Sequence, residues 1–161
     1  NIIKKGGGHK MAAGFTVEKT KISELRDFLI KNFQKSRSSS LQHVNLYLDT
    51  VIAPSALNED FYKEINTLGP FGSGNNEPKF VIENLQVIAY HLVGESHIKS
   101  VLLGKDGTVF KSLTWNGKNT PLEPFLKKEN KKKINIAGKM KLNQWKGKND
   151  IEFVIEDISV N

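Results

Sequence analysis

Residues 4–15, KKGGGHKMAAGF, hold the densest group of chemically useful residues in this 161-residue chain. Gly6, Gly7 and Gly8 directly precede His9. Glycines let a backbone approach a ligand closely and adopt positive φ, which exposes N–H groups to an anion. A histidine side chain can donate a hydrogen bond to a phosphate oxygen. The segment therefore predicts a phosphate-binding loop, and the alternative is a glycine-rich turn before a strand with its histidine idle at the surface.

A second candidate lies near the C-terminus, where the positive charge is concentrated. Residues 127–148 contain nine lysines and one glutamate, in a chain whose formal net charge is +7. Lysines that neutralise phosphates release counterions, so this segment favours a polyanionic partner. The alternative is a well-solvated lysine-rich surface.

Alternation within that segment predicts which of its side chains share a face. Lys139 and Lys141 alternate with apolar residues, so both point the same way on a strand. Trp115 and Trp145 can stack on bases, as aromatic residues of single-strand-binding proteins do, or can simply pack at strand ends. The residues predicted to bind a single strand are Lys139, Lys141, Trp145 and Lys146.

The remaining polar residues predict no catalytic centre in this chain. It has no cysteine, and its other histidines, His43, His91 and His97, lack metal-ligand spacing. Glu59 and Asp60 begin a predicted helix, where acids stabilise the helix dipole. No apolar run reaches the roughly 18 residues of a membrane span. We therefore expect no membrane partner, and a cytoplasmic location.

The N-terminal part reads as a strand and a helix. Residues 11–17 favour a short strand, and Thr20 is a candidate N-cap for a helix that ends near Lys35, before a polar linker at 36–40. This part is too short to bury both of its faces alone. The expected apolar stripe consists of Ile22, Leu25, Phe28, Leu29 and Phe33.

The central part predicts a strand, a helix and a specific loop. Alternation over 43–53 favours a half-buried strand, and Asn58 can cap a helix that carries Phe61, Ile65 and Leu68. Glycine and proline are dense over 69–78, which predicts a compact turn there.

The C-terminal part predicts a β-barrel. Apolar-rich strands flank the Asp106-Gly107 turn, a short helix follows Pro121, and two more strands form a second hairpin. Three strands, a helix and two strands are the order of an OB-fold, a five-stranded Greek-key barrel. An SH3-like barrel and a small sandwich are the alternatives. The expected strands span 79–94, 97–104, 108–115, 134–145 and 151–160.

Two motifs carry a family resemblance that spans essentially the whole chain. GGGHKMAAGF resembles the GGH-x-x-AAG signature of the C-terminal associated domain of DHH-superfamily phosphoesterases. LGPFGSGNNEPKF, residues 68–80, is similar to the L-x-PFG-x-GNPEP-x-F motif of the RecJ family of single-stranded-DNA-specific exonucleases. Asn76 stands where that family usually has proline, which loosens one turn.

The resemblance implies an α+β fold with three parts. Residues 1–38 would be part of a DHH-associated domain (strand plus helix), 39–78 a linking strand, helix and loop, and 79–161 the OB-like barrel. Gly6, Gly7, Gly8 and His9 would hold the substrate phosphate. The residues given a structural role are Ala12, Ala13 and Gly14, which let the strand pack closely, and Phe71, Gly72, Gly74, Asn75 and Pro78, which lock the barrel to its neighbours.

The resemblance also implies an activity for the longer protein. The RecJ family hydrolyses single-stranded DNA from its 5′ end with Mn or Mg, in DNA repair and recombination. The metal-binding aspartates and DHH histidines of that family have no counterpart in this chain, so the resemblance implies a C-terminal fragment that does not cleave alone. The chain begins at Asn1 without a start methionine, which we take as an argument against a free-standing module. The expected partners are single-stranded DNA and a single-strand-binding protein.

Other functions remain open. The chain could be a free-standing OB-type nucleic-acid-binding module, or a protein-interaction barrel whose lysines keep it soluble. An alanyl-tRNA synthetase-like protein is disfavoured by the loop at 69–78 and by the barrel.

Overall fold

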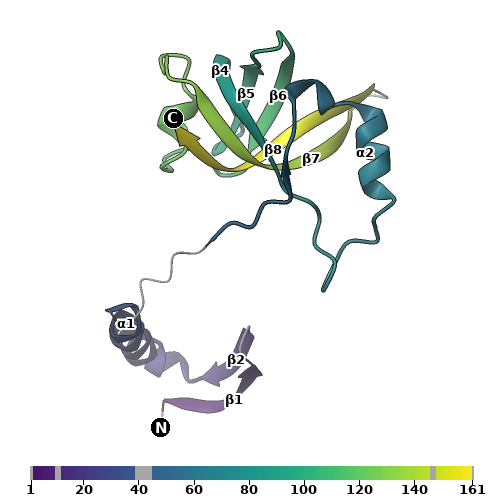
Figure 1. Ribbon diagram of the computed structural model, residues 1–161. Coiled ribbons are helices and arrows are strands. Elements are labelled where there is room, and N and C mark those ends of the chain that lie inside the picture. Colours follow the sequence, from purple (N-terminus) through teal and green to yellow (C-terminus); the bar gives the residue numbers. More distant parts are fainter. Residues whose placement is uncertain (1, 10–11, 39–44, 146–147, 161) are drawn as a thin grey trace. The chain divides into compact units, whose positions relative to one another are not determined.

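The chain folds as two compact units in a computed structural model. The units span Asn1–Asn45 and Leu46–Asn161 (Figure 1). The described residues are 2–9, 12–38, 45–145 and 148–160, with the backbone alone at 34–38, 145 and 148.

The first unit is a β-hairpin followed by a helix. Strand β1 (Ile3–His9) pairs antiparallel with β2 (Ala12–Val17), and a 3-10 turn at Lys19–Lys21 leads into α1 (Ile22–Ser38). The prediction of a loop at residues 6–8 is wrong. These three glycines lie within β1, where pairing with β2 holds the backbone extended, and none of them has a positive φ.

Helix α1 differs from its prediction at both ends. Thr20 lies inside the 3-10 turn that precedes α1, and Glu18 is the N-cap of that turn, without a side-chain capping bond. The helix continues past Lys35 to Ser38, because no glycine or proline interrupts the polar residues there. Of the predicted apolar stripe, Leu25 alone is buried. The stripe residues that stay exposed among the described atoms are Ile22, Phe28, Leu29 and Phe33.

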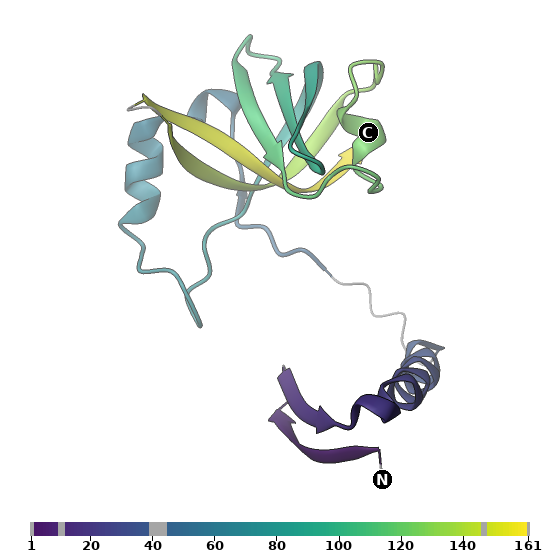
Figure 2. The same ribbon diagram turned by 180° about the vertical axis from the view of Figure 1, so that it is seen from behind.

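The second unit is a closed barrel, and this confirms the expected OB-like architecture and the mixed α+β class (Figures 1 and 2). With the short β3 (Thr50–Val51) at one edge, the strands follow the order β3-β4-β5-β6-β8-β7, and β4 pairs with β7 to close the barrel. Strand β8 joins β6 in parallel and β7 antiparallel. The barrel strands are β4 (Phe80–Val93), β5 (His97–Leu103), β6 (Val109–Thr114), β7 (Ile134–Trp145) and β8 (Lys148–Val160).

The barrel interior is filled by the inward side of the strand alternation. In β5, for example, Ile98, Ser100 and Leu102 are all buried, whereas the residues between them are half-exposed. Helix α3 (Glu123–Leu126) adds the fully buried Leu126. The predicted turn between β5 and β6 is confirmed at Gly107, which has φ +83°.

The strand expected at 43–53 is much shorter than predicted. Of the described residues 45–53, only Thr50–Val51 form a strand, β3, which runs parallel to the start of β4. Before it, the backbone is fixed instead by Asp49, whose N–H donates to the Lys79 carbonyl and whose carboxylate accepts from the Lys79 N–H. His43 and Val44 lie outside the described residues.

A 3-10 turn at Pro54–Ala56 leads to α2 (Glu59–Asn66), which packs against β7 and β8 (Figures 1 and 2). The predicted cap is confirmed, since the Asn58 side chain accepts a hydrogen bond of 2.9 Å from the Phe61 N–H. Ile65 is buried as expected, but Leu68 lies beyond the helix and is 61% exposed.

The loop after α2 is compact, as predicted. Gly72 and Asn75 form an isolated β-bridge, and Gly74 has φ +82°. The Asn75 side-chain amide donates to the carbonyls of Leu68 at 2.9 Å and Pro70 at 3.0 Å. Phe71 packs against the barrel core, so one aromatic side chain of the loop is anchored there.

Candidate nucleic-acid interface

Four lysines share one outer face of the barrel. Register partners in neighbouring strands point to the same side of a sheet. Pairing sets Lys99 of β5 beside Leu113 of β6, Leu113 beside Val154 of β8, and Val154 beside Lys139 of β7. We call the side chains of Lys99, Lys111, Lys139, Lys141 and Trp115 the lysine face.

The next row of the lysine face has the same arrangement. Lys111 of β6 is the partner of Glu152 of β8, and Glu152 is the partner of Lys141 of β7. The strands lie ~4.8 Å apart, so the lysines of one row are separated by two or three strand spacings. Both rows line shallow hollows on the barrel surface, the larger of which measures about 950 Å³.

The floor between Lys99 and Lys139 is apolar. Leu113 and Val154 are each 6% exposed, although they point away from the barrel interior. The neighbouring lysines and Trp115 line the same hollows and enclose this floor. An apolar floor with cationic edges suits a ligand that has flat apolar parts and anionic parts.

Trp115 follows β6 and carries the exposed aromatic ring of the lysine face. It is 50% exposed, and the His97 ring meets it edge-on with centroids 4.7 Å apart. The Lys141 ammonium lies 5.2 Å from the Trp115 ring centroid, within cation–π range. The His97 ring is itself fixed, because its Nδ1 accepts a hydrogen bond of 3.0 Å from the Asn116 N–H. The indole is therefore oriented before any ligand binds.

Two lysines of the lysine face are held by carboxylates of β8. Lys99 lies 3.0 Å from Glu152, and Lys111 pairs with Asp150. The hydrogen bond to Asp150, and then the attraction of that charge, raise the pKa of Lys111 above its usual value.

Lys139 is paired from a different element. Its ammonium lies 2.6 Å from Glu77 of the loop before β4, and that hydrogen bond raises the Lys139 pKa. Among the described residues, no carboxylate forms an ion pair with Lys141. Lys141 is therefore the lysine of this face whose charge is best placed to meet an external anion.

The structure brings together only part of the predicted single-strand site. Lys139 and Lys141 share a face, as the alternation predicts. Trp145 ends β7 and is described by its backbone alone, and Lys146 lies outside the described residues. The sequence reasoning missed Lys99 and Lys111, although the alternation in HIKSVLL and VFKSLT places both on the outward side of their strands.

The glycine-rich hairpin of the first unit offers bare backbone rather than a loop. Gly7 of β1 is the register partner of Gly14 of β2, and no described atom lies within 4 Å of a Cβ built at either position. Gly8 differs, because a Cβ there would meet Ala13 at 2.6 Å. Packing thus requires glycine at position 8, and leaves Gly7 and Gly14 open to solvent or to a ligand.

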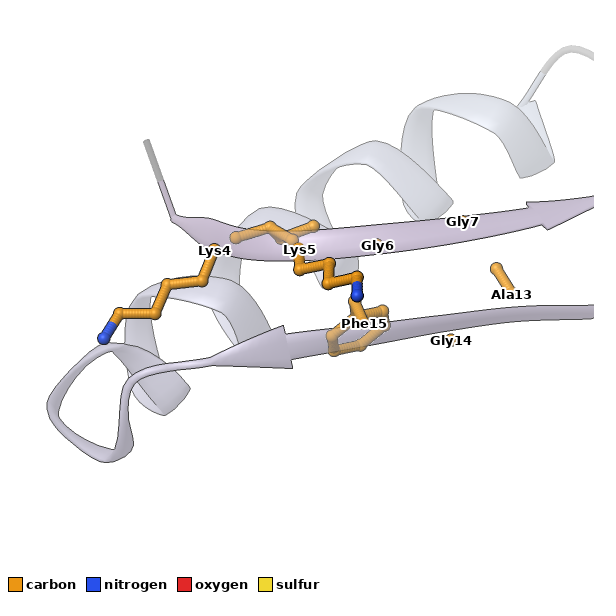
Figure 3. A pocket seen from close by; sticks show the side chains of 8 residues that line it. Lys4, Lys5, Gly6, Gly7, Ala13, Gly14 and Phe15 are labelled. Carbon is orange, nitrogen blue, oxygen red and sulfur yellow. The ribbon is translucent and has the colours of Figure 1, made fainter.

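A shallow hollow of about 400 Å³ lies along this hairpin and includes Gly6, Gly7 and Gly14. Figure 3 shows the Lys5 side chain extending toward Phe15, whereas Lys4 points away. The ammonium of Lys4 pairs with Glu18 at 3.1 Å.

Gly8 and His9 do not line that hollow. His9 pairs with Ala12 at the turn end of the hairpin. The predicted phosphate-binding residues thus lie on one strand but divide between its middle and its end.

The remaining polar candidates do not assemble into a catalytic site. Glu59 and Asp60 each lie 3.7 Å from Lys63 on α2, at distances typical of helix-surface pairs. Within the described ranges, no group of three His, Cys, Asp or Glu side chains could hold a metal ion. Nor does the described part of the chain contain a helix long and apolar enough to cross a membrane.

Comparison with known families agrees with this fold. The RecJ OB domain family matches residues 48–157. The chain belongs to the RecJ OB domain family. Its matched region begins before the barrel proper and so includes β3, α2 and the loop that carries Asn75.

Curated relatives extend the likeness over the whole chain. The single-stranded-DNA-specific exonuclease RecJ of Bacillus subtilis (strain 168) is 24% identical over 163 residues, covering 100% of this chain and 20% of the relative. RecJ of Escherichia coli (strain K12) is 24% identical over 159 residues, covering 98% of this chain and 26% of the relative. This chain thus spans about a fifth to a quarter of the RecJ proteins that it matches.

A solved structure shares the fold. The crystal structure of RecJ in complex with Mn²⁺ from Thermus thermophilus matches 98% of this chain and 22% of that protein, with a TM-score of 0.61 and 23% identity. The same RecJ is also known in complex with Mg²⁺. Both metals are properties of that protein, and the described donor set of this chain does not provide for them.

Proposed function

We propose that this chain is the nucleic-acid-binding C-terminal portion of a RecJ-type, 5′-directed exonuclease of single-stranded DNA that acts in DNA repair and recombination in the cytoplasm. In this proposal Mn or Mg, and the residues that hydrolyse the phosphodiester, belong to other parts of the longer protein. The chain itself binds substrate and does not cleave it, and a single-strand-binding protein is a second partner.

The observation that carries the proposal is the exposed Trp115 ring with the Lys141 ammonium 5.2 Å from its centroid. Single-strand-binding OB-folds combine aromatic stacking platforms with cationic grooves. An unstacked base can lie on the indole or on the apolar floor at Leu113 and Val154, while Lys141 neutralises a neighbouring phosphate. Duplex DNA cannot use this floor, because its bases are already stacked.

The glycine-rich hairpin supplies the second part of the proposal. Gly7 faces open space, so its backbone can approach a terminal phosphate closely. His9 at the turn end would donate a hydrogen bond to an oxygen of that phosphate. Gly6 and Gly8 would shape the hairpin, and Gly8 in particular permits the contact with Ala13.

Fluorescence anisotropy of a labelled oligothymidine, measured across a salt series, tests the barrel surface. We expect wild-type binding that weakens with salt, because phosphate contacts release counterions. Trp115→Ala should weaken binding about 5- to 150-fold, the range of one lost base stack of ~1–3 kcal/mol. Lys141→Gln should reduce the salt slope by ~0.7, the single-strand value for one phosphate.

Lys105→Gln is the matched control, since Lys105 is an exposed lysine in the β5–β6 turn that lines neither hollow. Equal binding by wild type, Trp115→Ala and Lys141→Gln would reject the barrel as a DNA surface and favour a protein-interaction barrel.

The hairpin is tested by comparing 5′-phosphorylated with 5′-hydroxyl oligonucleotides. His9→Ala and Gly7→Ala should each abolish any preference for the phosphate, while circular dichroism remains unchanged. Gly7→Ala adds a methyl group into open space, so the hairpin itself should tolerate it. A phosphate preference that survives both substitutions would contradict this part of the proposal.

A further inference from the structure

The lysine face is unusual because much of its charge is already neutralised from within the protein. Lys99 is paired with Glu152, Lys111 with Asp150, and Lys139 with Glu77. The chain as a whole carries a formal charge of +7, yet its candidate binding face approaches charge balance. A surface built only for affinity toward a polyanion would not place acids among its lysines.

The two pairs formed with β8 differ in how readily a phosphate can replace the acid. Glu152 has a side chain that is 5% exposed, and its Oε1 accepts from the Lys99 ammonium at 3.0 Å. A carboxylate this buried would lose its partner at a large cost if Lys99 turned toward DNA. In the pair of Lys111 and Asp150 both side chains are about half-exposed, so water or phosphate can compete for it.

Neutralised lysines affect single-stranded and double-stranded DNA unequally. Non-specific binding of duplex DNA comes essentially from phosphate contacts and counterion release, which depend on free cations. Single strands also bind by stacking their bases on aromatic side chains, and this contribution needs no free cation. Acids that occupy the lysines therefore weaken duplex binding more than single-strand binding.

We infer that Asp150 and Glu152 are specificity-determining residues that favour single-stranded over double-stranded DNA by holding the cations of Lys111 and Lys99. The inference rests on the proposed function, in which the lysine face binds the strand. Trp115 and Lys141 then provide the attraction that remains, and they discriminate by requiring an unstacked base. The two acids contact lysines, not DNA, and so act by positioning charge.

The test compares the affinity of the whole chain for oligothymidine with its affinity for a blunt duplex of equal length. Asp150→Asn combined with Glu152→Gln keeps the side-chain shapes and removes both negative charges. We expect duplex affinity to rise about tenfold or more at low salt, and single-strand affinity to rise less than about threefold. The duplex salt slope should steepen by as much as ~1.8, the value for two additional neutralised phosphates.

Matched variants separate this effect from a general change in charge. Asp60→Asn combined with Glu129→Gln changes the net charge equally, at exposed acids of α2 and of the segment after α3, and should leave the ratio of affinities unchanged. Adding Lys99→Gln to Glu152→Gln should cancel most of the gain of the latter, because the lysine that forms an ion pair with Glu152 is then absent. If the protein with Glu152→Gln does not fold, Asp150→Asn alone tests the inference, because its ion pair is about half-exposed. This single variant should also raise the ratio of duplex to single-strand affinity.

Each outcome decides between the two ideas. If the ratio of affinities is the same in the double variant and in its charge-matched control, the inference is overturned and the acids serve stability alone. If oligothymidine binding is insensitive to Trp115→Ala but duplex binding still rises in the double variant, the proposed function fails while the effect of the acids holds. If neither form of DNA binds any variant, both are rejected.

Discussion

Gly138 of β7 faces the backbone of Val154 so closely that a methyl group at position 138 would lie 1.9 Å from the Val154 carbonyl oxygen. The contact lies at a bulge in the pairing of β7 with β8, between Ala137 and Gly138. Val154 is also part of the floor of the lysine face, so this contact joins barrel closure to the candidate binding surface.

Gly138→Ala should therefore destabilise the barrel severely, by ~3 kcal/mol or more, because the atom that it meets is backbone and cannot rotate away. Urea unfolding followed by circular dichroism measures the change. Gly72→Ala is the control, since a Cβ at Gly72 meets no described atom within 4 Å. Similar urea midpoints of unfolding for Gly138→Ala and Gly72→Ala would contradict this prediction. They would show that β7 and β8 can move apart at the bulge without loss of stability.

Asn75→Ala should lower the free energy of unfolding by about 1–3 kcal/mol. The substitution removes the two hydrogen bonds that the Asn75 amide donates to the Leu68 and Pro70 carbonyls, each worth ~0.5–1.5 kcal/mol. Asn76→Ala changes the exposed neighbour and should remain within ~0.5 kcal/mol of wild type. A chemical-denaturation series on both variants checks the difference, and equal stabilities would contradict a locking role for Asn75.

Thr114→Val should stabilise the barrel by about 1 kcal/mol. The Thr114 hydroxyl is buried without a hydrogen-bond partner among the described atoms, so an isosteric methyl removes a desolvation cost. Ser112→Ala should do the opposite, because the Ser112 hydroxyl donates to the Ser100 carbonyl at 3.2 Å. Differential scanning calorimetry measures both, and a lower melting temperature for Thr114→Val would contradict the assignment.

Glu123 should contribute stability that depends on pH. The Asn119 N–H, and then the Tyr90 hydroxyl, donate to its carboxylate and lower its pKa below the usual 4.5. Between the two pKa values the unfolded chain binds more protons, so stability rises with pH there. This contribution is fully present above about pH 5 and is lost as the pH falls through the lowered pKa.

Urea midpoints from pH 3 to pH 7 test this dependence. Glu123→Gln should flatten the acid limb of the profile, and the exposed Glu129→Gln should leave it unchanged. Parallel profiles for wild type and Glu123→Gln would remove Glu123 as a source of the acid sensitivity.

Trp115 should report DNA binding through its own fluorescence. Stacking of a base on the exposed indole should quench its emission as oligothymidine is added. Trp145→Phe, which removes the other tryptophan, should retain the quenching, whereas Trp115→Phe should lose it. Quenching that persists in Trp115→Phe would move the contact to Trp145.

Local patterns explain how much of this architecture could be predicted. The Asp106-Gly107 turn, the Asn58 cap and the strand alternation are properties of neighbouring residues, and they led to the OB-like barrel. The strand predicted before Thr50 is wrong because a local pattern carries no information about pairing partners. Alternation of polar and apolar residues gives a strand only where a neighbouring strand is available to pair with it.

The candidate site depended on relationships that no local pattern contains. Glu77 meets Lys139 across more than sixty residues. Strand β8 lies between β6 and β7, which brings Glu152 within 3.0 Å of Lys99. The sequence alone therefore predicts lysines on a face, but not that acids hold several of them. The glycines of β1 are a second case in which a distant contact decides the structure. Glycine favours turns locally, but pairing with β2 holds these residues in an extended strand.

The position of β8 also has a consequence for the order in which the barrel is built. Strands β4, β5 and β6 form a meander whose pairings are local, whereas the pairing of β4 with β7 and of β6 with β8 joins distant segments. Contacts between residues near in sequence form early. Contacts between distant residues form slowly, because closing the long intervening loop costs conformational entropy before the contact stabilises the chain. During synthesis, β8 would be the final barrel strand to leave the ribosome. A nascent chain would then have Lys99 and Lys111 in place without Asp150 and Glu152, and these ion pairs would form only when β8 joins the barrel.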